Sequence, residues 1–326
     1  MKLLAFEVRN DEKAYFKKYA LEYQCEITCI SDPLTHDNLP MVQGYDAVSI
    51  LGRSYITADL QDKLAEHGIK CCVTRTIGYN QIDVEHAHEI GLKIANSNYP
   101  PTGVADYTVM LILIALRNYK QAMWRGNVND YSLNGLQGRE LHTLTVGIIG
   151  TGRIGQCVIK NLSGFGCKIL AYDMYENDTV KKYAEYTDLD TIISSCDIIS
   201  LHTPLLESTY HIINQEKINH MKDNVVLINC ARGELMDIDA LIYGIESQKI
   251  SALALDVIEG EDGIYHQDKR SDIISNEKMA YLRQFPNVTM TQHMAFYTDT
   301  AVSSMVNCAI KSARDLTEKG ICDTII

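Results

Sequence analysis

The sequence predicts an α/β protein built from two doubly wound parallel sheets, and two observations lead to that class. Short apolar runs alternate with longer stretches of helical periodicity, which is typical of strand–helix–strand units with helices on both faces of a sheet. The alternation occurs twice, from residue 3 and again from residue 144, and a loop-like segment at residues 96–101 follows the first series. A chain of 326 residues has room for about two domains of ordinary size.

The first series supplies the elements of one sheet. Apolar runs predict four strands, and helical periodicity predicts helices in two of the connections. The strands are expected at residues 3–6, 26–30, 47–51 and 70–74, and the helices at residues 12–23 and 58–67.

The second series supplies a second sheet, flanked by two long helices. Its strands are expected at residues 145–150, 168–173, 198–202, 225–230, 252–257 and 287–291, and its first helix at residues 154–162. The long helices are expected from residue 103 to about 117 and from 298 to about 319. The chain is therefore expected to leave the first domain near Tyr99 and to return to it near Thr298.

The expected helix from Val104 to Leu116 is apolar nearly all round. A helix of that kind is buried on more than one side. A subunit interface is one structure that would cover its second side.

Composition restricts the partners and the compartment. With 30 basic and 42 acidic residues the net charge is −12, which argues against nucleic acid or an anionic membrane as the main partner. The ten cysteines form no CxxC pair and match no metal-ligand spacing, so we expect reduced thiols and no metal. There is no apolar run of membrane-spanning length and no signal peptide pattern, which favours a cytoplasmic protein.

The strongest local motif is a glycine-rich turn between a predicted strand and a predicted helix, Gly150-Thr151-Gly152-Arg153-Ile154-Gly155. The next predicted strand ends in Asp173, which completes the pattern of a dinucleotide-binding Rossmann unit. The glycines allow a tight turn, close approach of a pyrophosphate and close helix packing, and the helix N-terminus attracts phosphate. An acid at Asp173 would bind the ribose hydroxyls and repel a 2′-phosphate, which favours NAD(H) over NADP(H).

Three residues that suit carbonyl reduction follow later strands of the second series: Arg232, Glu261 and His293. Ligands bind at the carboxyl ends of strands in sheets of this kind. His293 would give a proton to the carbonyl oxygen, and Glu261 would stabilise the imidazolium. The planar fork of Arg232 suits a substrate carboxylate. These roles predict reduction of a 2-oxo acid.

The motifs around these residues resemble those of the D-2-hydroxyacid dehydrogenases over almost the whole chain. The segments that carry the resemblance are residues 75–83, 104–108, 202–205, 229–234, 255–261 and 292–298. Within the family, the Phe-Tyr-Thr ending of the last segment is most similar to the D-lactate dehydrogenases, including the vancomycin-resistance type. Related phenyllactate dehydrogenases are nearly as similar.

The resemblance implies further roles and the organisation of the chain. Cofactor contacts are implied for Arg153, Ile154, His202, Thr203, Pro204, Ala231 and Asp256, the last to the nicotinamide amide. Substrate contacts are implied for the N–H groups of Ile77 and Gly78, for Arg232 and His293, and for Tyr99 and Phe296 beside the substrate side chain. A Rossmann NAD-binding domain of residues 100–297 is expected to interrupt a flavodoxin-like substrate domain of residues 1–99 plus 298–326. Members of the family are typically homodimers joined through the cofactor domain, so the resemblance implies a homodimer joined through the Val104–Leu116 helix.

Three functions remain open from the sequence. The sequence favours the first, NADH-dependent reduction of pyruvate to D-lactate, over the second, reduction of bulkier 2-oxo acids such as phenylpyruvate or 2-oxoisocaproate. The third, from another class, is an NAD-sensing binding protein like the corepressors that share this fold.

Overall fold

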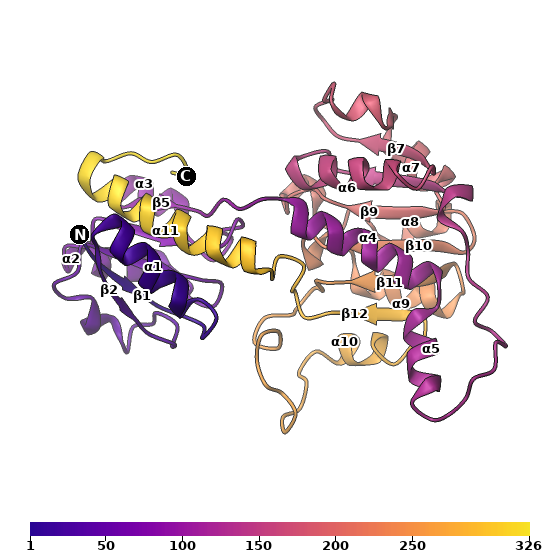
Figure 1. Cartoon of the computed structure of the whole chain (residues 1–326), viewed down its shortest axis with the longest axis horizontal. Helices are drawn as coiled ribbons and strands as arrows, with labels where there is room; N and C mark the ends of the chain where they lie inside the picture. Colours follow the sequence, from indigo (N-terminus) through magenta and orange to yellow (C-terminus); the bar gives the residue numbers. More distant parts are fainter. The chain divides into compact units, whose positions relative to one another are not determined.

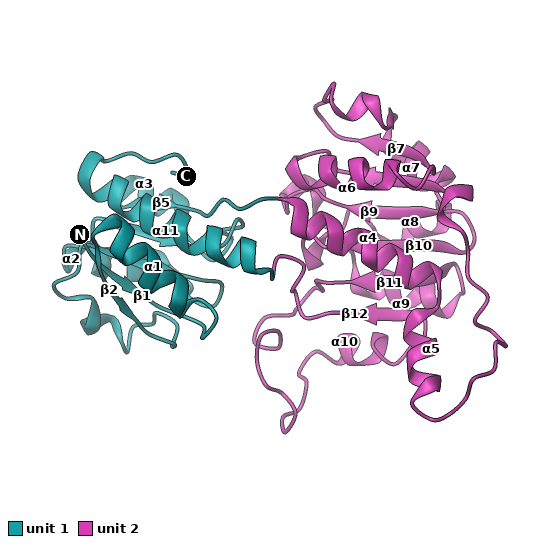
Figure 2. Ribbon diagram, viewed as in Figure 1, with its two compact units in different colours: residues 1–100, 297–326 teal, residues 101–296 magenta.

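The computed structural model describes all residues from 1 to 326 and divides into two compact units (Figure 2). Unit 1 comprises Met1–Pro100 and Tyr297–Ile326, and unit 2 comprises Pro101–Phe296. Each unit contains one parallel sheet covered by helices, which confirms the predicted fold class. Pro100 and Tyr297 belong to unit 1, whereas the sequence placed them with the cofactor domain.

Unit 1 has a five-stranded sheet in the order β2-β1-β3-β4-β5, with every neighbouring pair parallel. The strands are β1 (Lys2–Ala5), β2 (Glu26–Cys29), β3 (Ala47–Ile50), β4 (Cys71–Thr74) and β5 (Lys93–Ala95). On one face lie α1 (Lys13–Tyr23) and α11 (Asp299–Lys319), and on the other α2 (Ala58–Glu66) and α3 (Val84–Ile90) (Figure 1). Side chains alternate between the faces along a strand, so Leu3 packs toward α1 and α11 and Leu4 toward the opposite helices.

Unit 2 has a seven-stranded parallel sheet in the order β12-β11-β10-β9-β6-β7-β8. The strands are β6 (Thr145–Ile149), β7 (Lys168–Tyr172), β8 (Glu185–Tyr186), β9 (Ile198–Leu201), β10 (Val225–Asn229), β11 (Ile250–Leu255) and β12 (Val288–Met290). The strand order reverses at β6, whose carboxyl end is where a doubly wound sheet binds its ligand.

Helices cover both faces of the unit 2 sheet (Figure 1). On one face, α4 (Thr102–Leu116) packs against α6 (Arg153–Ser163) and over β10 and β11. The main apolar core of the unit lies on the other face, beneath α7 (Leu189–Ser195), α8 (Gln215–His220), α9 (Ile238–Glu246) and α10 (Glu277–Leu282). The helix α5 (Tyr119–Gly126) follows α4 and buries none of its residues. None of the helices combines the length and the apolar character that a bilayer crossing requires.

Several elements of the structure were not among those expected. They are β5, β8, α3, α5 and the four helices from α7 to α10. Most are short: β5 has three residues and β8 has two. Elements of that length contain less than one clear hydrophobic repeat, so periodicity cannot reveal them.

Candidate active site

The glycine-rich turn has the shape that dinucleotide binding requires. Gly150 has a φ of 95°, and a Cβ there would lie 2.6 Å from the carbonyl carbon of His202. A Cβ on Gly155 would collide with the carbonyl oxygen of Gly150. A Cβ on Gly152 would meet nothing within 4 Å, so open space lies in front of the N-terminus of α6. The residues present therefore fit a bound pyrophosphate.

Asp173 follows β7 and is bonded to the same turn. Its Oδ2 accepts hydrogen bonds from the backbone N–H of Thr151 at 2.6 Å and from the hydroxyl of Thr151 at 3.1 Å. Its Oδ1 accepts from the N–H of Tyr175 at 3.1 Å. A carboxylate oxygen has more than one lone pair, so these bonds leave capacity for ribose hydroxyls.

His202 lies at the end of β9 beside the glycine-rich turn. Its backbone N–H donates to the carbonyl oxygen of Ile149, and its Nε2 lies 2.9 Å from the hydroxyl of Ser200. Desolvation by burial lowers the pKa of His202 to about 4, so the ring is neutral at pH 7. Thr203 and Pro204 continue the same turn, and the backbone nitrogen of Thr203 faces Gly150.

A buried carboxylate shapes the turn that carries His293. Asp256 is 1% exposed, and its oxygens accept from the Thr291 hydroxyl at 2.6 Å and from the N–H groups of Met294 and Ala295 at 2.9 and 2.7 Å. Its carbonyl oxygen accepts from the N–H of His293 at 2.8 Å. His293 itself has a φ of 51°, which a residue other than glycine adopts only when its surroundings impose it.

The same turn brings His293 to Glu261. The Nδ1 atom of His293 lies 2.5 Å from Oε1 of Glu261, and Oε2 of Glu261 accepts from the N–H of Ile258 at 2.8 Å. The Glu261 carboxylate is therefore held through Oε2 by the backbone of Ile258, and its Oε1 holds the imidazole ring of His293. This arrangement occupies Nδ1 and leaves Nε2 as the nitrogen that can exchange a proton with a ligand.

Arg232 lies in a turn that Asn229 organises. The side-chain oxygen of Asn229 accepts from the N–H of Ala231 at 2.9 Å, and its amide donates to the carbonyl oxygen of Arg232 at 2.8 Å. Nη1 of Arg232 donates to the carbonyl oxygen of Ala231 at 2.7 Å. A guanidinium has five N–H groups in a planar fork, so this one bond leaves donors for a carboxylate.

In unit 1 the loop after β4 presents two backbone N–H groups. The carbonyl oxygens of the loop are bonded: that of Ile77 accepts from Asn96 at 2.8 Å, and that of Gly78 accepts from the hydroxyl of Thr76 at 2.6 Å. The N–H groups of Ile77 and Gly78 donate to no acceptor in the chain. Two free, adjacent N–H groups form a suitable binding site for a carboxylate.

The loop is anchored by Arg75, which is fully buried. Its guanidinium donates to Glu12 at 2.9 Å, to the Ser49 hydroxyl at 3.0 Å, and to the carbonyl oxygens of Phe6 and Glu7 at 2.8 and 3.1 Å. Because Arg75 directly precedes the loop, this network sets where the loop begins.

Within unit 2 the structure brings together His293, Glu261 and Asp256. Phe296 also lies near His293, with ring centroids 6.4 Å apart and nearly perpendicular planes. Ile77, Gly78 and Tyr99 belong to unit 1, where Tyr99 is half-buried. Sequence reasoning missed the organising roles of Asn229, Arg75 and His266, whose Nε2 bonds the carbonyl oxygen of His293 at 3.0 Å. Arg75 and Asn229 begin two of the segments that carry the family resemblance, residues 75–83 and 229–234, and this was the signal that could have indicated them; no such segment contains His266.

Comparison with protein families identifies one domain type in the chain. The family described as "D-isomer specific 2-hydroxyacid dehydrogenase, NAD binding domain" matches residues 109–295. The match covers the glycine-rich turn, Asp173, Arg232, Glu261 and His293, and it supports NAD as the cofactor.

Characterised proteins resemble the chain over nearly its whole length. An aromatic 2-oxoacid reductase of Clostridium sporogenes is 43% identical over 324 residues, which are 99% of this chain and 98% of the relative. A D-lactate dehydrogenase of Lactiplantibacillus plantarum is 35% identical over 327 aligned residues, which span 99% of this chain and 98% of that protein.

Solved structures resemble it as well. The NAD-complexed D-isomer specific 2-hydroxyacid dehydrogenase of Lactobacillus delbrueckii ssp. bulgaricus has a TM-score of 0.88 at 32% identity, with both chains fully covered. The agreement extends over both units rather than over the NAD-binding unit alone.

Proposed function

The chain belongs to the D-isomer specific 2-hydroxyacid dehydrogenase family, and from this premise we propose that His293, Glu261 and Arg232 carry out its reduction of 2-oxo acids with NADH. The observation that carries the proposal is the 2.5 Å contact between His293 Nδ1 and Glu261 Oε1. It holds the imidazole in one orientation, with Nε2 available to the substrate.

The reduction needs one hydride and one proton. NADH, when bound, supplies a hydride to the carbonyl carbon of the 2-oxo acid. His293 Nε2 donates the proton to the carbonyl oxygen as negative charge develops there. Glu261 stabilises the imidazolium before the transfer and keeps the ring in place after it. In the reverse direction His293 takes the proton from the hydroxyl group.

Substrate binding is assigned to three sets of groups. Arg232 binds the carboxylate and polarises the carbonyl through its planar fork. The N–H groups of Ile77 and Gly78 bind the carboxylate from the backbone, which is supported by their lack of any acceptor in the chain. Tyr99 and Phe296 border the substrate side chain.

Cofactor binding is assigned to the glycine-rich turn and the segments beside it. Gly150, Gly152, Gly155 and the N-terminus of α6, with Arg153 and Ile154, hold the pyrophosphate. Asp173 binds the ribose and disfavours a 2′-phosphate. The further contacts are assigned to His202, Thr203, Pro204, Ala231 and Asp256.

The substrate is proposed to be an aromatic 2-oxo acid such as phenylpyruvate, with pyruvate as the second candidate. The Clostridium sporogenes relative is named for aromatic 2-oxo acids and shares 43% of its residues with the chain, whereas the Lactiplantibacillus plantarum relative named for D-lactate shares 35%. The sequence alone had favoured pyruvate over bulkier acids, so the two substrates need a direct comparison.

A homodimer and a cytoplasmic location complete the proposal. The helix α4 has the mixed burial of an interface helix: Met110 is 39% exposed although most of its neighbours are buried. The following segment exposes Trp124, Tyr131 and Leu133 at 69%, 78% and 84%. All ten cysteines are free thiols, which suits a reducing compartment.

The test is oxidation of NADH by a panel of 2-oxo acids, with chiral analysis of the product. We expect turnover with phenylpyruvate and pyruvate, and the larger kcat/KM for phenylpyruvate. His293→Ala should reduce kcat by about 10²–10⁴-fold while NADH binding stays unchanged. The control is His142→Ala, because His142 is an exposed histidine of the same unit. NADH binding without turnover of any 2-oxo acid would instead indicate an NAD-sensing protein.

A further inference from the structure

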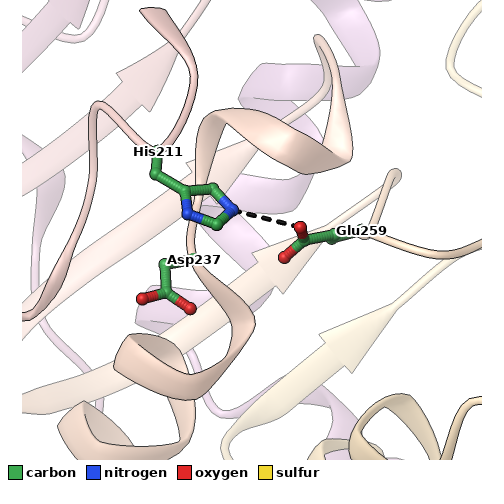
Figure 3. A group of neighbouring side chains, drawn as sticks. All are labelled: His211, Asp237 and Glu259. Carbon is green, nitrogen blue, oxygen red and sulfur yellow. Dashed lines mark hydrogen bonds and ion pairs between the residues drawn. The ribbon is translucent and has the colours of Figure 1, made fainter.

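A second cluster of chemically capable side chains lies in unit 2, and the reaction assigned above does not use it. It consists of His211, Asp237 and Glu259, which we call the His211 cluster (Figure 3). One imidazole nitrogen and one oxygen from each carboxylate lie within 4.8 Å of one another. All three side chains are half-buried rather than fully solvated.

Each member is positioned by a different segment. His211 follows the short 3₁₀ turn η4 (Glu207–Thr209), Asp237 precedes α9, and Glu259 follows β11. The backbone of His211 has a φ of 48°, and its N–H donates to the carbonyl oxygen of Glu234 at 2.9 Å. The ring of His211 also stacks on that of Tyr210, with centroids 3.9 Å apart. The imidazole is therefore held in place by contacts outside the cluster.

The two carboxylates retain capacity for another ligand. Glu259 Oε1 accepts from His211 Nε2 at 3.1 Å and from the Tyr210 hydroxyl at 3.3 Å, so its bonds in the chain use one of its two oxygens. Asp237 Oδ1 accepts from the N–H of Asp239 at 3.0 Å, again with one oxygen.

The local charge is negative. With a neutral imidazole the cluster carries two negative charges in a partly desolvated position, which is costly without a counterion. The nearby cation, Lys278, bonds to Asp239 at 2.7 Å and acts on Asp237 and Glu259 only through its charge, without a bond to either. A divalent cation would neutralise both charges.

We propose that the His211 cluster binds a divalent first-row transition cation, with Zn²⁺ as the best fit. One imidazole and two carboxylates are ligands that Zn²⁺ accepts at about 2.0–2.2 Å, with water as the fourth ligand. A tetrahedral site of that size holds its ligand atoms about 3.4 Å apart, so closing the cluster requires movements of at most about 1.5 Å. The three ligands are far apart in the sequence, which explains why no ligand spacing revealed them.

The ion would connect the segments that lead to two residues of the reaction. Gly233 follows Arg232, and a Cβ on Gly233 would collide with the backbone of Ile258 and Glu259. Glu259 lies two residues before Glu261 in the same loop. A cation on Glu259 would therefore restrain the segment that positions Glu261, without touching the substrate or the cofactor.

The test uses Co²⁺ as a spectroscopic probe and Zn²⁺ as a competitor, with the full chain freed of metal by a chelator. Co²⁺ is suitable because thiolate ligands give intense absorption bands that nitrogen and oxygen ligands do not, and the chain has ten free cysteines. We expect one Co²⁺ per chain with a nitrogen–oxygen spectrum, displaced by Zn²⁺. His211→Gln and Glu259→Gln should each weaken binding at least ~10-fold.

The matched control is His86→Gln in unit 1. His86 also faces two carboxylates, but through opposite nitrogens: Nε2 lies 2.8 Å from Asp62 and Nδ1 lies 3.5 Å from Glu89. This variant should bind Co²⁺ like the unchanged protein. Melting temperatures measured in the presence of chelator show whether each variant is folded. If His211→Gln is not folded, the metal affinity of Glu259→Gln tests the proposal. No saturable binding, a thiolate spectrum, or equal affinity in the folded variants would overturn the proposal.

Discussion

The loop of Ile77 and Gly78 in unit 1 and the turn of His293 in unit 2 are held by buried charges of opposite sign. Arg75 anchors the first and is 0% exposed, and Asp256 anchors the second and is 1% exposed. Arg75 bonds an opposite charge, Glu12, as well as two carbonyl oxygens. The carboxylate of Asp256 is satisfied by two N–H groups and one hydroxyl, with no cation among these donors.

The difference determines what each region loses when its anchor is removed. Without Arg75, Glu12 keeps a buried negative charge whose main partner is gone. Without the charge of Asp256, only neutral N–H and O–H donors lose a partner. An unpaired neutral donor destabilises the fold less than an unpaired buried charge. Unit 1 should therefore depend more on its anchor for stability, whereas unit 2 should depend on its anchor mainly for the orientation of His293.

The largest effect is expected for Arg75→Met. The substitution keeps an unbranched apolar stem but removes the guanidinium that bonds the buried Glu12 carboxylate at 2.9 Å and leaves the more distant Arg9 guanidinium at 3.9 Å, which costs about 3–5 kcal/mol of unfolding free energy. Urea denaturation measures it. The double variant Arg75→Met/Glu12→Leu should recover much of this stability. Replacing both partners of a buried ion pair by apolar side chains destabilises the fold less than removing one partner and leaving the other charge buried. If the double variant is less stable than the single one, the ion pair is not what anchors the loop.

The next effect is a pH dependence with opposite signs in the two units. Burial lowers the pKa of His202 to about 4, so the unfolded chain binds a proton below about pH 6.5 that the folded unit 2 excludes. This contribution is fully present above pH 6.5 and is lost toward pH 4, by about 2–3 kcal/mol. In unit 1 the hydrogen bond to Asp62 raises the pKa of His86, so protonation of His86 favours the folded state.

Denaturation at pH 7.5, 5.5 and 4.5 measures this difference. His202→Gln should flatten the loss of stability between pH 6.5 and 4. His86→Gln should instead make the loss on acidification slightly steeper. An unchanged pH profile in His202→Gln would show that a different group is responsible.

A smaller loss of stability, about 2 kcal/mol, is expected for Asp256→Asn. The amide keeps the size of the side chain, but its NH₂ group must face an N–H donor of the His293 turn. The turn should then loosen, and kcat should fall by roughly 10–100-fold because a small displacement of the acid slows proton transfer. Steady-state kinetics with denaturation on the same samples separates the two effects. A fall in stability with an unchanged kcat would contradict the positioning role.

The smallest effects come from a matched pair of threonines, one in each region. The Thr76 hydroxyl donates to the carbonyl oxygen of Gly78 and the Thr291 hydroxyl donates to Asp256, both at 2.6 Å. Replacing either by valine removes this bond, worth about 1 kcal/mol, together with the further contacts of the Thr76 hydroxyl to Thr74 and Gln81 or of the Thr291 hydroxyl to Leu255. Thr76→Val should raise KM for the 2-oxo acid about 5-fold and leave kcat unchanged, and Thr291→Val should lower kcat by a similar factor. The same kinetic change in both variants would remove the distinction between the two regions.

The features that the sequence could predict are local ones. The strands, the glycine-rich turn and its acid are each contained in a short segment, and Glu261 and His293 each follow a strand. The anchors are not local: Arg75 bonds Glu12 across 63 positions, and Asp256 bonds Ala295 across 39. Nothing in either segment indicates its partner, because the contact exists only after the sheet has formed. The left-handed backbone of His293 is a consequence of that contact and is equally invisible in the sequence.

The discontinuity of unit 1 bears on how the protein is made. Val306, Ile310 and Leu316 of α11 belong to the core on one face of its sheet, and the N–H of Ile326 bonds the carbonyl oxygen of Ile94. A ribosome produces these residues only after it has completed all of unit 2. During synthesis one apolar face of the β1–β5 sheet therefore stays partly exposed to solvent, because α11 has not yet been made. The continuous unit 2 can fold as soon as it emerges from the ribosome. Unit 1, which is completed last, is therefore the unit more prone to misassembly in the cell.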